Sequence, residues 1–169
     1  MSPLRRVRLS DFMAETRILL KMASVPVVKA LLYLAELIVR DGCVKDPIEF
    51  YGDLSSQSST SIARVGEGNG SCSLSVYQVC SPAVRKTAVA MAISPEGVRL
   101  KRDHVARFVV LVASPEGPVS PNLALPSKVV SLFGDSARRE RMLACAGPAE
   151  VLARVREHER QGETTAQGA

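Results

Sequence analysis

Apolar side chains recur at helical spacing over residues 24–39. Val27 and Ile38 fall on one stripe of this segment, together with most of its other apolar residues. Ser24 can cap the start of the helix, and Gly42 stands just past its end, where a left-handed conformation is favourable. The stripe is wide, so the sequence predicts a helix that packs against a sheet.

Start signals and apolar spacing indicate four more helices. Asp46 is a cap residue, and Pro47 follows it at the first helical position, where proline is tolerated. Asp135 supplies a similar cap later in the chain. The polar run 55–61 is expected to be a loop or a frayed helix end. The predicted helices begin at Pro47 and then cover about 123–133, 135–146 and 149–159.

Short apolar runs predict the strands. Residues 108–113 are the clearest, because they are rich in β-branched side chains, and we expect them at the centre of the sheet. Pro95 to Gly97 is expected to form a turn, after which Val98 and Leu100 can add a short strand. Apolar and small polar residues alternate over 72–79, which is typical of a strand with one exposed face. The other predicted strands cover 18–22 and 87–93.

Helices before and after the strands, in a chain of 169 residues with 46% apolar content, predict one domain of the α/β class. We expect a mixed β-sheet covered by helices in a single sandwich. The predicted boundaries are a basic N-terminal leader at 1–8, the folded domain at 9–161 and a disordered tail at 162–169.

Composition and charge narrow the possible partners. The net charge of +5 is scattered, aromatic residues make up 4% of the chain and tryptophan is absent, so no nucleic-acid partner is predicted. Lys29 and Glu36 interrupt the longest apolar stretch, so no membrane insertion is expected. The cysteines lack zinc spacing, so we expect reduced thiols in a cytoplasmic protein, with no metal and no cofactor. The four are Cys43, Cys72, Cys80 and Cys145.

Candidate chemistry is sparse, because the chain holds only two histidines. His158 lies in a polar segment near the end, and His104 lies in a charged turn just before residues 108–113. The segment 66–70, GEGNG, is rich in glycine, and its backbone N–H groups could converge on an anion. It lacks the lysine and hydroxyl residue of a phosphate-binding P-loop, so a tight turn between two elements remains the simpler interpretation.

From Leu9 to about Glu157, the order of segments resembles the enzyme IIA domain of the phosphoenolpyruvate-dependent phosphotransferase system, in the branch of the fructose, mannitol and nitrogen-regulatory IIA proteins. The opening LSDFMAETRILL is similar to the family's entry into its first strand. GEGNG matches its glycine turn, and PAVRKTAVAMA, RFVVLVASPEG and LPSKVVSLFGDSARRERMLACAGPAEVLARV match the later strands and closing helices. The resemblance implies a single-domain IIA-like sandwich.

The resemblance also implies where reactive residues should lie. In the family, one histidine shortly after the glycine turn accepts a phosphoryl group from a small phosphocarrier protein, and a second histidine stabilises the charge. Counting back from Pro82, the acceptor position falls on Gln78, and counting back from Leu132–Phe133, the second position falls on Asn122. The family's arginine aligns near Ser59, with Arg64 close enough to substitute. No histidine lies between the glycine turn and Pro82 in any register.

An amide cannot replace the imidazole in this chemistry. The lone pair of the amide nitrogen is delocalised into the carbonyl, so Gln78 is no nucleophile, although it keeps hydrogen-bonding capacity and similar bulk. Tyr77, Cys80 and Ser75 are alternative acceptors nearby in the sequence. Each also has a purely structural interpretation, as a half-buried ring, a small apolar residue and an outward-facing strand residue.

The sequence therefore predicts a nitrogen-regulatory-type IIA-like protein that lacks the phosphoacceptor histidine and acts as a regulatory protein-binding module. The possible partners are a phosphocarrier protein, a transporter or a sensor kinase, and the sequence does not specify the oligomeric state. Two alternatives stay open: an active phosphotransferase component that uses His104 or another acceptor, and a small-anion binding module. The predicted binding residues are Arg64, Gly66, Gly68, Asn69, Gly70, Tyr77, Gln78 and Asn122.

Overall fold

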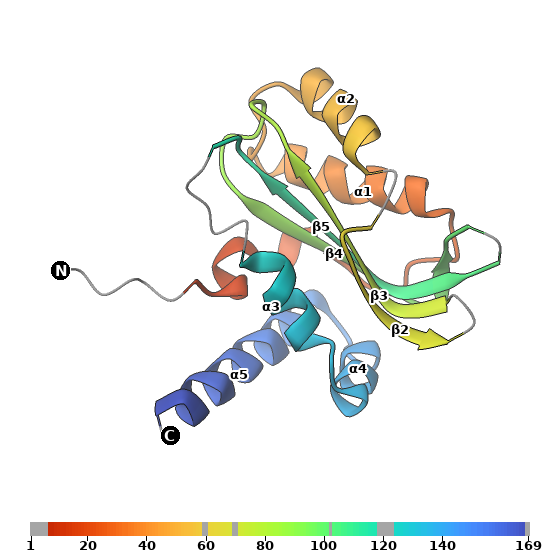
Figure 1. Ribbon diagram of the computed structural model, residues 1–169, viewed down its shortest axis with the longest axis vertical. Coiled ribbons are helices and arrows are strands. Elements are labelled where there is room, and N and C mark those ends of the chain that lie inside the picture. Colours follow the sequence, from red (N-terminus) through yellow and green to blue (C-terminus); the bar gives the residue numbers. More distant parts are fainter. Residues whose placement is uncertain (1–6, 59–60, 69–70, 102, 118–123, 168–169) are drawn as a thin grey trace.

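A five-stranded mixed sheet forms the centre of the computed structural model (Figure 1), which describes residues 7–58, 61–68, 71–101, 103–117 and 124–167. The strands lie in the order β1-β4-β5-β3-β2. This architecture confirms the predicted α/β class with a mixed sheet covered by helices. The strand bounds are Ile18–Leu19 for β1, Ala63–Gly68 for β2, Ser71–Cys80 for β3, Ala88–Arg99 for β4 and Val105–Ser114 for β5.

The pairing of the strands places β5 in the middle. It pairs antiparallel with β4 and parallel with β3, while β1 runs parallel to β4 and β2 runs antiparallel to β3. Every side chain from Phe108 to Ser114 is buried. A near-continuous run of β-branched residues is therefore explained by burial on both faces, as its sequence predicts.

Helices cover both faces of the sheet (Figure 1). One core lies beneath α1 and α2 and includes Leu34 and Phe50. The other lies beneath the closing helices and includes Phe108 and Phe133, whose ring centroids are 4.5 Å apart. The helix bounds are Leu9–Phe12 for the 3₁₀ helix η1, Glu15–Arg17 for η2, Val27–Arg40 for α1, Pro47–Gln57 for α2, Leu125–Leu132 for α3, Ser136–Leu143 for α4 and Pro148–Gln167 for α5.

The predicted caps are partly confirmed. Asp46 accepts a hydrogen bond from the Glu49 amide at 3.2 Å, and Asp135 accepts one from the Ala137 amide at 3.2 Å. Gly42 adopts a φ of 77°, the left-handed conformation expected after α1. The prediction for Ser24 was wrong, because the residue before α1 is Pro26 and no side chain caps this end.

Three expected elements differ from those observed. The Pro95–Gly97 segment is a bulge inside one continuous β4, where the register shifts between Ile93 and Val98, and the Gly97 amide donates to the Ser94 hydroxyl at 3.1 Å. The strand expected at 18–22 is limited to Ile18–Leu19. Helix α5 continues to Gln167 instead of ending near residue 159, so it takes in most of the segment expected to be a disordered tail.

Two further features bear on function. Among the described residues, none of the helices combines the length and the apolar character that a membrane span requires. The same residues hold no cluster of three or more His, Cys, Asp or Glu side chains that could bind a metal ion.

Candidate functional site

The candidate site lies where the parallel strands β3 and β5 end, with Gln78 beside Val112 and Cys80 beside Ser114. Side chains alternate between the two faces of a strand. Val76 belongs to the core beneath α3 and α5, so Gln78 and Cys80 face the same side of the sheet as those helices. Gln78 is half-buried and reaches this face from the part of β3 that lies beyond its pairing with β2.

The end of β3 is held in place by a side-chain amide from α2. The Cys80 amide donates to Oε1 of Gln57 at 2.8 Å, and Nε2 of Gln57 donates to the Cys80 carbonyl at 2.8 Å. The Cys80 thiol lies 3.3 Å from the Ser114 hydroxyl on the neighbouring strand. Gln57 thus satisfies both backbone groups of Cys80, in the way that a further strand would.

The next residue, Ser81, is engaged by hydrogen bonds as well. Its hydroxyl donates to Oδ2 of Asp53 at 2.5 Å and accepts from the Ala83 amide at 3.1 Å. Its own amide donates to the Ser114 carbonyl at 3.0 Å. Gln57, Asp53, Ser81 and Ser114 therefore form an ordered polar rim around Cys80 at the carboxyl end of β3, two residues after Gln78, and none of these groups is an imidazole.

The structure separates several of the predicted binding residues from Gln78. Tyr77 is only 3% exposed and belongs to the core beneath α1 and α2, on the opposite face of the sheet. Arg64 pairs with Ser75 across β2 and β3, and its Nε donates to the Ser61 hydroxyl at 2.8 Å. Asn122 lies outside the described residues. The predicted constellation is therefore not one site.

Two serines on β3 correct the prediction of a half-exposed strand. Ser73 and Ser75 are buried, because β2 and β5 flank β3 and helices cover its faces. Oγ of Ser75 has no hydrogen-bond partner within the part of the chain that the structure describes. An outward-facing role for Ser75 was wrong, and its burial keeps it away from any large phosphoryl donor.

The glycine-rich segment lies at the other end of β3. Gly68 pairs with Ser71, and Gly66 belongs to β2 at an irregular part of the pairing. At about 3.3 Å per residue, the step from Ser71 to Gln78 is roughly 23 Å. Asn69 and Gly70 lie outside the described residues. Gly66 and Gly68 therefore do not form a common cleft with Gln78.

Neither histidine lies beside Gln78. His104 precedes Ala106, which pairs with Cys72 at the amino end of β3, so it is roughly 25 Å from the strand ends that carry Gln78 and Val112. His158 is on α5, where burial and then the charge of Arg138 lower its pKa. Phosphoryl transfer that involves both His104 and the Gln78 position would require the two residues to be in contact, and the strand register excludes this.

The three cysteines whose side chains the structure describes are free thiols: Cys43 and Cys145 are buried, and Cys80 is half-buried. Burial, reinforced by the nearby Glu150 carboxylate, raises the pKa of the Cys145 thiol, which keeps it protonated and unreactive. Among these three cysteines, Cys80 is the one that is partly accessible and lies within the polar rim.

Searches with the sequence itself find no matching family model and no matching curated protein. Solved structures do match. Nitrogen regulatory protein IIA-Ntr from Neisseria meningitidis aligns with a TM-score of 0.66 at 16% identity, covering 87% of this chain and 98% of that one. IIA mannitol from Escherichia coli aligns with a TM-score of 0.67 at 22% identity, covering 84% and 97%.

The chain has the IIA fold of the phosphotransferase system. A further match is the Escherichia coli mannitol IIA enzyme in its complex with phosphorylated mannitol IIB, with a TM-score of 0.67, 23% identity and coverage of 85% of this chain and 96% of that one. The match extends over nearly the whole of each IIA domain, as the resemblance in the sequence implies. At these identities the likeness establishes the fold.

Some residues of the site were not anticipated from the sequence. Gln57 and Ser114 come from segments far apart along the chain, and only the tertiary fold brings them to Cys80. The sequence places Asp53 in the helix that starts at Asp46–Pro47, and this indicates only weakly that its carboxylate has a role in the site. Nothing in its local pattern indicates that it accepts a hydrogen bond from Ser81.

Proposed function

We propose that this chain is a IIA-type protein that does not carry phosphate on histidine and acts by binding other proteins. The observation that carries the proposal is the carboxyl end of β3, where Gln78 lies two residues before the ordered polar rim around Cys80 and both described histidines lie elsewhere. An amide at this position offers hydrogen bonds without a nucleophilic lone pair.

The fixed hydrogen bonds of the polar rim favour binding of a partner protein as the function of this face. Gln57 and Asp53 hold the Cys80 backbone and the Ser81 hydroxyl in fixed positions, so the strand end that follows Gln78 is preorganised. A preorganised surface loses little conformational entropy when a partner binds. The mannitol IIA enzyme of Escherichia coli, which shares this fold, is solved in complex with phosphorylated mannitol IIB. We infer that this chain likewise docks a protein on this face, as a permanently unphosphorylated IIA.

The docking part is tested by affinity capture from the native lysate, with the wild type and two variants that each add one arginine. Gln78→Arg places a charge and bulk on the proposed face. Ala153→Arg adds the same charge at an exposed position of α5 and serves as the matched control. Thermal unfolding confirms that all three proteins are folded before capture.

We expect the wild type and Ala153→Arg to retain the same proteins, and Gln78→Arg to lose at least one of them. Identical capture by all three folded proteins would show that the β3 end is not the docking face. Loss with Ala153→Arg alone would move the docking surface to α5 and would equally contradict the proposal.

A further inference from the structure

A small basic pocket lies between α4 and α5, with a volume of about 40 Å³. None of the residues described at the end of β3 lines it, so it is separate from the candidate site and does not depend on the proposed function. Its lining residues come from one face of each helix and are Arg138 and Arg141 of α4 and Arg154, Glu157, His158 and Gln161 of α5.

Helical spacing brings these side chains together. Arg138 and Arg141 are three residues apart on α4, and such residues are neighbours on the surface of a helix. The four residues of α5 follow the same three- and four-residue spacing. Helix α4 ends at Leu143 and α5 begins at Pro148, so only a short connection separates the two faces along the chain.

Two of the three arginines are held in place by neighbouring groups of the protein. Nη1 of Arg138 donates to the Leu132 carbonyl at 3.1 Å and to the Ser131 carbonyl at 3.4 Å. Nη1 of Arg154 lies 3.5 Å from Oε2 of Glu157. Each guanidinium carries five N–H donors, so these contacts leave donors of both arginines for a ligand.

Arg141 supplies the third guanidinium. Within the described part of the chain, its side chain forms no hydrogen bond and no ion pair. Arg141 is exposed, Arg138 is half-buried, and the side chain of Arg154 is 39% exposed. A ligand that enters from solvent can therefore reach the arginines without any rearrangement of the core.

The positive charge of the pocket is not balanced. Glu157 is the only carboxylate among the described residues that line it, so two of the three arginine charges have no counterpart there. Burial, followed by the charge of Arg138, lowers the pKa of His158, and the imidazole is therefore neutral near pH 7. The effect of Arg138 on His158 also indicates that its positive field extends across the pocket.

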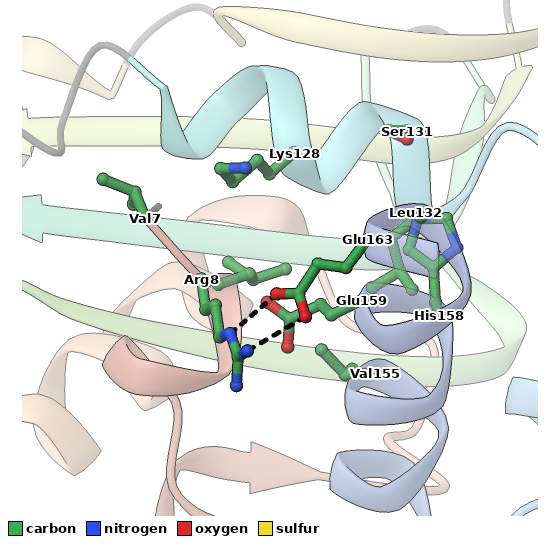
Figure 2. Close-up of a pocket in the computed structure, with 11 residues that line it drawn as sticks. Val7, Arg8, Lys128, Ser131, Leu132, Val155, His158, Glu159 and Glu163 are labelled. Atoms are coloured by element: carbon green, nitrogen blue, oxygen red, sulfur yellow. Dashed lines mark hydrogen bonds and ion pairs between the residues drawn. The ribbon is translucent and has the colours of Figure 1, made fainter. Parts of the chain in front are cut away.

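His158 also lines a larger cavity of about 310 Å³, between the segment before η1, α3 and α5 (Figure 2). There the Arg8 guanidinium forms a two-point ion pair with Glu163, with Nε to Oε1 at 2.9 Å and Nη2 to Oε2 at 3.0 Å (Figure 2). Lys128 and Glu159 add one charge of each sign. The charges of this cavity balance, so an anion is favoured in the pocket between α4 and α5.

The size of the pocket suits a small oxyanion. About 10–15 Å³ of such space holds one water-sized group, so 40 Å³ holds about three of them. A phosphate group presents oxygen atoms of about that size and up to two negative charges. Planar guanidinium groups bind such oxygens through parallel N–H donors, which gives the interaction geometry as well as charge.

We propose that the pocket between α4 and α5 binds a phosphate dianion, either free or as the monoester of a small molecule, with Arg138, Arg141 and Arg154 donating to its oxygens. A dianion offsets both unbalanced positive charges, whereas a carboxylate offsets only one. The pocket has room for the phosphate group alone, so the organic part of a monoester remains in solvent.

The test titrates inorganic phosphate and glycerol 3-phosphate separately into the ¹⁵N-labelled full chain, at low ionic strength and just above neutral pH. Amide shifts are followed by NMR. We expect saturable shifts at Arg141, Arg154 and His158, with a dissociation constant on the order of 1 mM for so small a ligand. Acetate at the same ionic strength should bind at least about tenfold more weakly. Tighter binding of one phosphate probe identifies the source, and equal affinities show that the phosphate group alone is recognised.

Three variants assign the binding to the pocket. Arg141→Gln should weaken phosphate binding by about tenfold or more. Arg156→Gln removes the same charge from an exposed position of α5 outside the pocket and should leave the affinity unchanged within about twofold. Glu157→Gln removes the opposing carboxylate and should strengthen binding by about threefold. Thermal unfolding confirms that each variant is folded.

Several results would overturn the proposal. Absence of saturable shifts at the pocket with both phosphate probes would do so, as would acetate binding as tightly as phosphate. Equal affinities of Arg141→Gln and Arg156→Gln would show that only the overall charge of the chain matters. Weaker phosphate binding by folded Glu157→Gln would show that its carboxylate does not oppose the anion.

Discussion

Replacing Gln57 by alanine removes the side-chain amide that holds the end of β3. Two hydrogen bonds of 2.8 Å to the Cys80 backbone are lost. A typical intramolecular hydrogen bond contributes about 0.5–1.5 kcal/mol net. Gln57 is exposed, so water replaces part of the lost bonding, and we expect the lower half of that range for each bond. The free energy of unfolding should therefore fall by about 1–2 kcal/mol.

Thermal unfolding measures the global effect, and amide hydrogen exchange measures the local one. For a chain of this length, the loss corresponds to a decrease in Tm of about 3–6 °C. Exchange at the Cys80 amide should become faster, because that N–H donates to Gln57. Gln57→Glu keeps the acceptor but sets a second oxygen against the Cys80 carbonyl, so it should also destabilise.

The matched control for Gln57→Ala is Ser55→Ala, an exposed position in the same helix, which should leave both readouts unchanged within about 0.5 kcal/mol. The reasoning is refuted if Gln57→Ala has the Tm of the wild type and the Cys80 amide exchanges at the wild-type rate. In that case the amide pair does not order the end of β3, and the proposed docking face loses its rigid support.

Two further predictions concern the bulge of β4 and the histidine of α5. Gly97→Ala should lower the free energy of unfolding in urea by about 2–4 kcal/mol, because its φ is 94° and a Cβ there would stand 2.6 Å from Cβ of Val105; wild-type stability would contradict this. The pKa of His158 is lowered from its ordinary value of 6.5 by burial first and then by Arg138, so the unfolded state binds the proton more readily. Stability contributed by the neutral imidazole above pH 6.5 should be lost as the pH falls through the lowered native pKa. In urea unfolding, the free energy of unfolding of His158→Gln should fall less than that of the wild type over this pH range. Equal losses in the variant and the wild type would contradict the assignment of the effect to His158.

Local patterns were sufficient for much of the fold. The helical stripe that holds Leu34 and Ile38 predicts α1, and the β-branched run of β5 predicts a central strand. Asp46 predicts the start of α2, because its side chain acts on an amide only three residues away. These features depend on interactions within one element, so the sequence contains the needed information.

The candidate site was harder to predict from the sequence than the fold, and the reason differs from residue to residue. Tyr77 and Gln78 are neighbours on a strand, and alternation alone places them on opposite faces, so this separation could have been inferred. The length of β3 likewise implies that its glycine-rich start lies far from Gln78. Gln57 carries no local signal, because its partner Cys80 is brought to it by the packing of α2 against β3.

The full length of α5 could not be inferred from local sequence either. The residues after Glu159 are polar and indicate a tail, yet α5 continues, and Arg8 pairs with Glu163 across the chain. Helix propensity is a weak guide where a distant segment packs against the helix. The contact between Arg8 and Glu163 therefore depends on an association of the two ends of the described chain that neither end indicates alone.

The central claim is that no imidazole stands where a phosphoryl group would be accepted. It is tested most directly by incubating the purified chain with phosphoenolpyruvate, the first enzyme of the phosphotransferase system and its phosphocarrier, beside a histidine-containing IIA domain as positive control. We predict that intact-protein mass spectrometry shows phosphoryl transfer to the control and an unchanged mass for this chain. An acid-labile phosphoryl adduct on any side chain of this protein, Cys80 included, would contradict the account.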